Sequence, residues 1–282
     1  MTTAHLTGKE IDFLLYISRF QDERGRVAGV HYKALCGEMH MSHQEFYNAM
    51  RALEEKGFIR CGKTNRIDHD IVILGNVYAG REKEYQSEGY VTTSHNIFYC
   101  EDFRELKAGA KLLAMIFMQI GMVGTKKGMD RRYRIGIKNF YEKYTKLLGV
   151  TKRVVRTYLR ELKQFFTVER REKMYCIFPK RVVEKKKYAK SEADNYREHS
   201  VDVICRRNRI CDARMKEKNE LRDLLFQYRQ VAAELHTDLT ETLARAVYKS
   251  LEMINEGIRG TWKRTLNVRL VHKLMRKELG IA

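Results

Sequence analysis

A repeated pattern of apolar residues constrains the fold of this 282-residue chain more than any other feature of its sequence. Residues 32–60 align with residues 141–169 at a fixed offset. Few identities are shared, but the apolar positions coincide, which indicates that one supersecondary unit occurs twice. The coinciding pairs are Phe46 with Val155, Met50 with Leu159, and Leu53 with Leu162.

Each copy contains two short helices joined by a tight turn. Gly149 suits the left-handed backbone of such a turn in the second copy, and His40 takes the same place in the first. Ser42 and Thr151 follow as predicted N-caps, and Glu45 completes a capping box in the first copy. The second helices are predicted over residues 42–56 and 151–165, each with one apolar face.

An apolar helix precedes each pair of helices, and a β-hairpin follows it. The helix, helix-turn-helix and hairpin, in this order, form the winged-helix arrangement. The first helices are predicted over residues 9–20 and 108–121. The hairpin strands are predicted over residues 58–61 and 70–74 in the first copy, and over 167–170 and 174–178 in the second.

The chain resembles tandem winged-helix DNA-binding proteins. The second copy, from Phe103 through the segment KLLAMIF to Gly149, is similar to the winged-helix part of Firmicute plasmid and mobile-element replication initiators. The first copy, in the segment MSHQEFYNAMRALEEKGFI, resembles winged-helix transcription regulators. The resemblance implies a mainly α fold with small β-hairpin wings. Two tandem winged-helix domains at 6–78 and 96–180, a linker at 79–95 and a helical C-terminal region at 188–282 are expected.

Positive charge is concentrated in the second copy. The chain has 55 Lys and Arg against 36 Asp and Glu, which gives a formal net charge of +19. Residues 108–187 carry 22 basic and 6 acidic side chains, whereas residues 1–78 carry 10 of each. A charge that served only solubility would be spread more evenly along the chain. A concentrated basic face is typical of proteins that bind phosphate groups. The expected partner is double-stranded DNA.

The second helix of the second copy turns a basic face outward. Arg153 and Arg156 lie near its N-terminus, where contact with bases is usual, while Arg160 and Lys163 are expected on phosphates. The alternative is a basic face that only meets solvent. The positions predicted to bind DNA on this helix are Lys152, Arg153, Arg156, Thr157, Arg160 and Lys163.

The first copy presents a more neutral face, which suits direct reading of bases. Its predicted outward set is His43, Gln44, Tyr47, Asn48 and Arg51. Since residues 1–78 carry no net charge, a protein-docking surface is the alternative. The two copies are therefore expected to divide the work, the second attracting DNA and the first discriminating its sequence. Wing residues predicted to reach phosphates or the minor groove are Lys63, Arg66, Arg170, Arg171 and Lys173.

The C-terminal third has no glycine or proline between Pro179 and Gly257, which predicts long helices. A break is expected near residues 216–220, an Asp238-capped helix up to residue 256, and a last helix over 262–279 capped by Thr261. Two interpretations remain open: the helices form a homodimer, or they pack back onto the winged helices. Trp262 is expected as a core or interface anchor.

No motif for catalysis or a cofactor is present. GxxxxGK[ST], HExxH and GxSxG are all missing, and the nine histidines lack metal-ligand spacing. The six cysteines form no CxxC pair and are expected as free, buried thiols. No segment approaches the roughly 18 apolar residues that span a bilayer. The sequence predicts a non-enzyme without metal or cofactor, with no membrane contact, located in the cytoplasm at the nucleoid.

These features predict a sequence-specific double-stranded DNA-binding protein, most simply a transcription regulator acting through two winged helices. One alternative is a replication initiator of a plasmid or mobile element, which would use the same contacts at an origin. A second alternative is a structural protein whose winged helices bind other proteins. The concentration of charge at residues 108–187 disfavours the last of these.

Overall fold

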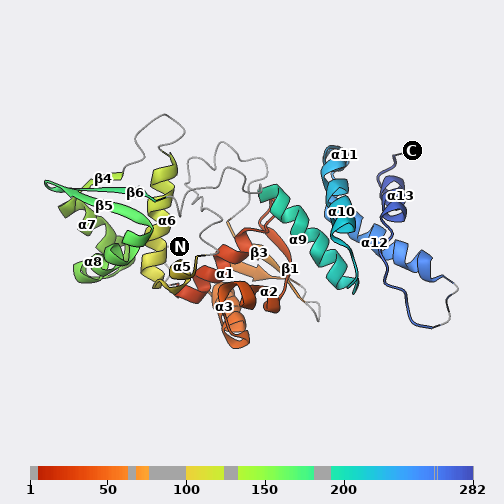
Figure 1. Ribbon diagram of the computed structural model, residues 1–282, viewed down its shortest axis with the longest axis horizontal. Helices are drawn as coiled ribbons and strands as arrows, with labels where there is room; N and C mark the ends of the chain where they lie inside the picture. Colours follow the sequence, from red (N-terminus) through yellow and green to blue (C-terminus); the bar gives the residue numbers. More distant parts are fainter. Residues whose placement is uncertain are drawn as a thin grey trace. The chain divides into compact units, whose positions relative to one another are not determined.

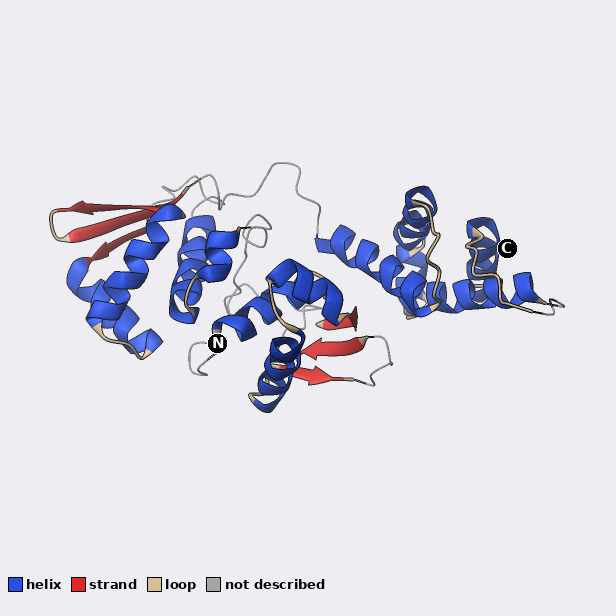
Figure 2. Ribbon diagram, turned by 60° about the horizontal axis from the view of Figure 1, so that its bottom comes forward, coloured by secondary structure: helices blue, strands red, loops and turns tan. Residues whose placement is uncertain are grey.

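The computed structural model describes residues 6–62, 68–75, 100–123, 133–180, 192–256, 258 and 260–281 (Figure 1). The chain divides into two compact units: Met1–Gly62 with Ile71–Ala189, and Lys63–Asp70 with Lys190–Ala282. Helices dominate, and two small sheets of three strands each accompany them (Figure 2). The predicted mainly α composition with small β elements is thus confirmed. The predicted linker at 79–95 lies outside the described residues.

The first repeat contains three helices and three strands. In chain order they are α1 (Gly8–Ser18), β1 (Arg26–Val30), α2 (Tyr32–Met39), α3 (His43–Glu55), β2 (Ile59–Cys61) and β3 (His69–Ile73). The strand order in the sheet is β1-β3-β2. His40 has a φ of 47°, and the predicted capping box joins Ser42 and Glu45 through hydrogen bonds of 3.2 and 2.7 Å.

The second repeat follows the same order of elements. It begins with α5 (Glu101–Glu105), an addition that precedes the repeated pattern. The strand order β4-β6-β5 matches that of the first sheet. The remaining elements are α6 (Ala108–Val123), β4 (Tyr133–Gly136), α7 (Ile137–Leu148), α8 (Lys152–Glu161), the 3-10 turn η3 (Leu162–Gln164), β5 (Phe166–Arg171) and β6 (Met174–Pro179).

Two expectations about the second repeat were wrong, and two strands were missed. Strands β1 and β4 were not predicted at all. The helix expected over residues 151–165 ends at Glu161 and gives way to the 3-10 turn. Thr151 occupies the N-cap position with an extended backbone, but its side chain forms no capping hydrogen bond. Side-chain capping therefore stabilises the start of α3 and not that of α8.

One continuous hydrophobic cluster runs through both repeats within the first unit. Helices α1 and α6 pack against each other, and the buried ion pair of Asp12 and Lys111 links them. The ammonium nitrogen of Lys111 lies 2.8 Å from each carboxylate oxygen of Asp12, and the two side chains are only 2% and 4% exposed. Because a buried charge is tolerated only with its partner, this pair ties the two repeats together.

The second unit has its own hydrophobic core. Its helices are α9 (Glu192–Arg207), α10 (Met215–Gln227), α11 (Arg229–Glu234), α12 (Leu239–Asn255) and α13 (Val268–Glu278). The expected break at residues 216–220 is wrong, since α10 runs through them. The chain leaves the helix earlier because Arg209 has a φ of 54°, and it restarts where the carboxylate of Glu217 accepts the Arg214 backbone N–H at 2.7 Å.

The last helix also differs from its prediction. Asn267, not Thr261, caps it, and residues 262–267 are not helical. The buried side chain of Asn255 accepts the backbone N–H of Lys263 at 2.6 Å and donates to its carbonyl at 2.8 Å, which holds this segment in a loop. Trp262 is 40% exposed, so it is not a core anchor within this unit. Asp238 caps α12 as predicted.

Candidate nucleic-acid interface

Helix α8 is held firmly by the elements around it. Gly149, with a φ of 62°, ends α7 in the left-handed conformation that the sequence predicted. Val155, Tyr158 and Leu159 bury one face of α8. A Cβ atom added at Gly109 of α6 would lie 2.5 Å from the Tyr158 ring, so α8 rests directly on the α6 backbone. The orientation of the opposite face is thereby fixed.

The opposite face of α8 and η3 is basic and exposed. None of its five cationic side chains forms an ion pair with another described residue, although the described part of the same repeat contains seven Asp and Glu side chains. Thr157 was expected on this face, but it is half-buried and its hydroxyl donates to the Arg153 carbonyl at 3.2 Å. The five exposed cations are Lys152, Arg153, Arg156, Arg160 and Lys163.

Two tyrosines that sequence reasoning missed flank the start of this basic face. The hydroxyl oxygens of Tyr141 (α7) and Tyr175 (β6) lie 3.0 Å apart. The ammonium nitrogen of Lys152 lies 4.9 Å from the centre of the Tyr141 ring, a cation–π distance. Interaction with the Tyr141 hydroxyl raises the pKa of Arg156, so the guanidinium lies beside that hydroxyl. The tyrosines therefore position two of the predicted DNA-binding cations.

The pKa values of the two tyrosines are shifted in opposite directions. Burial raises the pKa of Tyr141, but hydrogen bonds from Tyr175 and Arg156, with the charges of Arg156 and Lys152, bring it below its usual value. Burial, followed by the hydrogen bond to Tyr141, raises the pKa of Tyr175 to about 12. Either hydroxyl can be the donor of the bond between them.

The β5–β6 hairpin adds further cations beside the sheet. Arg170 and Lys173 are exposed, as expected of wing residues. Arg171 is also exposed but forms an ion pair with Glu169 at 2.8 Å, which offsets part of its charge. The turn between the strands places Glu172 at a φ of 50°. The corresponding residues of the first repeat, Lys63 and Arg66, lie outside the described residues.

Helix α3 presents four of its five predicted side chains to solvent: His43, Gln44, Asn48 and Arg51. Tyr47 is half-buried, because its ring packs edge-on against the neighbouring rings of Phe46 and His43. The Gln44 amide donates to the Asn48 side-chain oxygen at 2.9 Å. This bond fixes the two amides relative to each other, and each keeps further donor or acceptor capacity for a base edge.

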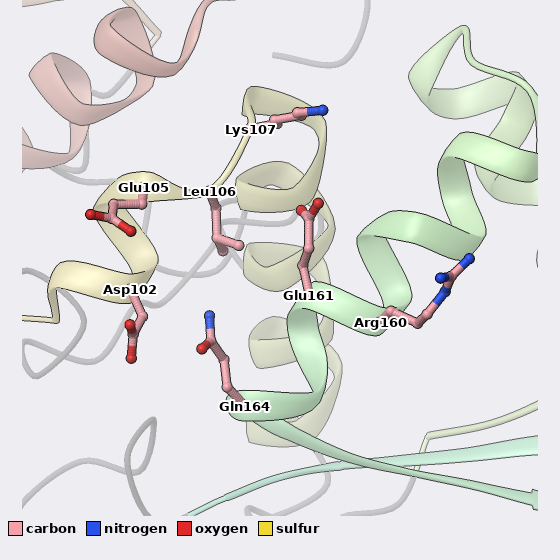
Figure 3. A pocket seen from close by; sticks show the side chains of 7 residues that line it. All are labelled: Asp102, Glu105, Leu106, Lys107, Arg160, Glu161 and Gln164. Atoms are coloured by element: carbon pink, nitrogen blue, oxygen red, sulfur yellow. The ribbon is translucent and has the colours of Figure 1, made fainter.

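A pocket of about 450 Å³ lies beside the C-terminal end of α8. In Figure 3 the Glu161 carboxylate points toward Leu106 and Lys107, whereas the Arg160 guanidinium points away from the other lining residues. One carboxylate oxygen of Glu161 is buried without a hydrogen-bond partner among the described residues. Carboxylates outnumber cations in the lining, so the pocket is chemically distinct from the basic face. Its lining residues are Asp102, Glu105, Leu106, Lys107, Arg160, Glu161 and Gln164.

Other kinds of site find little support among the described residues. They contain no group of three or more His, Cys, Asp or Glu side chains that could hold a metal ion. All six cysteines are free, but only Cys176 and Cys205 are buried and Cys211 is exposed, so the expectation of uniform burial was wrong. No described helix is long and apolar enough to cross a membrane.

No protein-family model matches the sequence, and no curated protein matches it at a significant level.

Proposed function

We propose that this chain is a sequence-specific double-stranded DNA-binding protein, most simply a transcription regulator, that acts through two winged helices and catalyses no reaction. The identical order of elements in the two repeats, and the matching strand orders of their sheets, support the tandem winged-helix assignment. In this assignment α3 and α8 are the recognition helices, and the β2–β3 and β5–β6 hairpins are the wings.

The exposed basic face of α8 is the observation that carries the proposal. Five cations without ion-pair partners among the described residues lie on one side of a single short helix segment. On a face that only served solubility, neighbouring carboxylates would reduce the repulsion between the cations. The five cations here lack such partners among the described residues, so they are available to attract anions. A helix of this width fits the major groove, and its spacing of cations suits a row of phosphates with bases between them.

Salt dependence and substitution on α8 test the attraction to DNA. Binding of the full chain to a random-sequence duplex of about 30 base pairs, three helical turns, is measured by fluorescence anisotropy. With about 6–10 phosphates neutralised, affinity should fall about 10³–10⁵-fold between 50 and 200 mM salt. Arg153→Ala with Arg156→Ala should abolish binding at the higher salt, because both charges leave the proposed contact face.

A charge-matched variant controls for net charge alone. Lys273→Ala with Lys277→Ala removes two exposed cations from α13 in the other unit and should leave affinity close to that of the wild type. A nearly flat salt titration of the wild type would rule out DNA binding as the function and favour protein docking. Equal losses in the two double variants would show that the α8 face has no special role.

Site selection tests the part played by the first repeat. Selection from a randomised duplex pool should recover a motif bound about 10³–10⁷-fold more tightly than random DNA. Gln44→Ala with Asn48→Ala should relax the preference within that motif while sparing binding to random duplex, since neither residue carries charge. An unchanged motif would assign discrimination to α8 instead. Recovery of repeated origin-type sites rather than a promoter operator would favour replication initiation.

A further inference from the structure

The hydroxyl groups of Tyr141 and Tyr175 have two O–H donors, and the hydrogen bond between them uses only one. The two oxygens lie 3.0 Å apart, and each hydroxyl has one proton to donate. The pair uses only one of these protons internally, so one O–H has no acceptor among the described residues. Tyr141 is only 5% exposed, and Tyr175 is half-buried. A buried donor without an acceptor is uncommon and calls for a ligand or an ordered water.

The groups around the pair are donors as well. Arg156 lies beside the Tyr141 hydroxyl, and Lys152 lies over the Tyr141 ring. Arg170 contributes positive charge near Tyr175. No described carboxylate pairs with Lys152 or Arg156. The cluster therefore holds several donors and at least two full positive charges, and it lacks a negatively charged acceptor.

We propose that Tyr141, Tyr175, Lys152 and Arg156 together form a cradle for one backbone phosphate of duplex DNA. A phosphodiester supplies a negative charge and two free oxygens, which match one hydroxyl donor and two cations. The inference rests on the function proposed above and changes one of its details. Arg156 becomes a phosphate contact, and direct base reading at the start of α8 passes to Arg153.

A duplex phosphate fits better than a free phosphate ion because the positive charge continues beyond the cradle. Arg153, Arg160 and Lys163 extend along the same exposed face. A single free ion would leave these side chains unused, whereas a polyanionic strand engages them in succession.

The test uses the same random-sequence duplex and measures separately how the tyrosine hydroxyls and the positive charges contribute to affinity. Tyr141→Phe and Tyr175→Phe should each weaken binding by about tenfold, the usual effect of losing a hydrogen bond to a charged group. The slope of log affinity against log salt should not change, because a neutral hydroxyl releases no counterion. Arg156→Gln should reduce the magnitude of that slope by about one.

Tyr144→Phe is a matched control. Its hydroxyl donates to the Tyr133 hydroxyl at 3.2 Å, and the side chain is fully buried, so this variant also removes a tyrosine–tyrosine bond but away from the proposed cradle. Its duplex affinity should equal that of the wild type. Circular dichroism of each variant verifies that the fold persists.

The outcomes distinguish failure of the proposed function from failure of the phosphate cradle. If the wild type does not bind the duplex, the proposed function fails. If it binds with a steep salt dependence and both Phe variants bind equally well, the cradle alone is overturned. Titration with inorganic phosphate, followed by NMR of labelled tyrosine rings, tests the free ion. Saturation well below about 1 mM, abolished by Tyr141→Phe while duplex affinity stays unchanged, would assign the cluster to a free anion instead.

Discussion

The ion pair of Asp12 and Lys111 brings two full charges into the core of the first unit. Burial raises the pKa of Asp12 although the charge of Lys111 opposes this, and burial likewise lowers the pKa of Lys111. In both residues the cost of leaving water outweighs the attraction of the partner. The pair is therefore a device that specifies how α1 meets α6 more than a source of stability.

Removing one partner of the Asp12–Lys111 pair should lower the free energy of unfolding far more than removing both. Lys111→Met leaves the Asp12 carboxylate buried without a counterion and should cost about 3–5 kcal/mol in the free energy of unfolding. Asp12→Val combined with Lys111→Met should restore wild-type stability or exceed it. Urea denaturation measures both, and a milder effect of the single variant than of the double would contradict this interpretation.

The same pair predicts a pH dependence. Because the folded pKa of Asp12 lies above its unfolded value, its contribution to stability is present in acid and is lost as the pH rises through the carboxyl range. The stability advantage of the double variant over the wild type should therefore grow as the pH rises from acid to neutral.

At the level of elements, α3 and α8 begin after equivalent turns but are secured differently. Ser42 and Glu45 cap α3 from both sides, while Thr151 leaves the first backbone N–H groups of α8 without a side-chain acceptor. Packing compensates in α8, where Tyr158 contacts the backbone of α6 at Gly109. The basic helix thus begins with backbone donor groups that its own cap residue does not satisfy.

Substitution of the two cap residues should reveal this difference. Ser42→Ala should destabilise the protein by about 1 kcal/mol, and Thr151→Ala should have a much smaller effect. The hydrogen bond from the Ser42 backbone is the main reason that the pKa of Glu45 is lowered. The stability from Glu45 is therefore present at neutral pH and lost as the pH falls below about 4. Thermal unfolding at both pH values measures these effects, and equal losses for the two variants would contradict them.

Across the whole chain, local signals in the sequence predicted the local features well. The left-handed turns at His40 and Gly149 and the capping box of α3 involve neighbouring residues, so the sequence displays them directly. Strand β4 was missed because its four residues become a strand only by pairing with β6, about 40 positions away. The loop at Trp262 was taken for helix because its determinant, the Asn255 side chain, acts across a turn.

In the candidate site, too, the features formed by residues distant in the sequence were not predicted. The exposed cations of α8 follow from helical periodicity, which places them opposite Val155, Tyr158 and Leu159. The role of Tyr141 could not be read in this way, since its partner Tyr175 is 34 positions distant and the two meet only when β6 joins the sheet. Thr157 and Tyr47 were misplaced because a backbone acceptor and a neighbouring ring turn them partly inward.

The separation of Asp12 and Lys111 along the chain has a consequence during protein synthesis. The ribosome produces Asp12 99 positions before Lys111, and at about 5–20 residues per second this is a delay of roughly 5–20 s. Throughout that interval the nascent first repeat carries an uncompensated carboxylate on the surface that α6 will later cover. A charged carboxylate favours hydration of this surface, and Lys111 is the residue that later pairs with it directly.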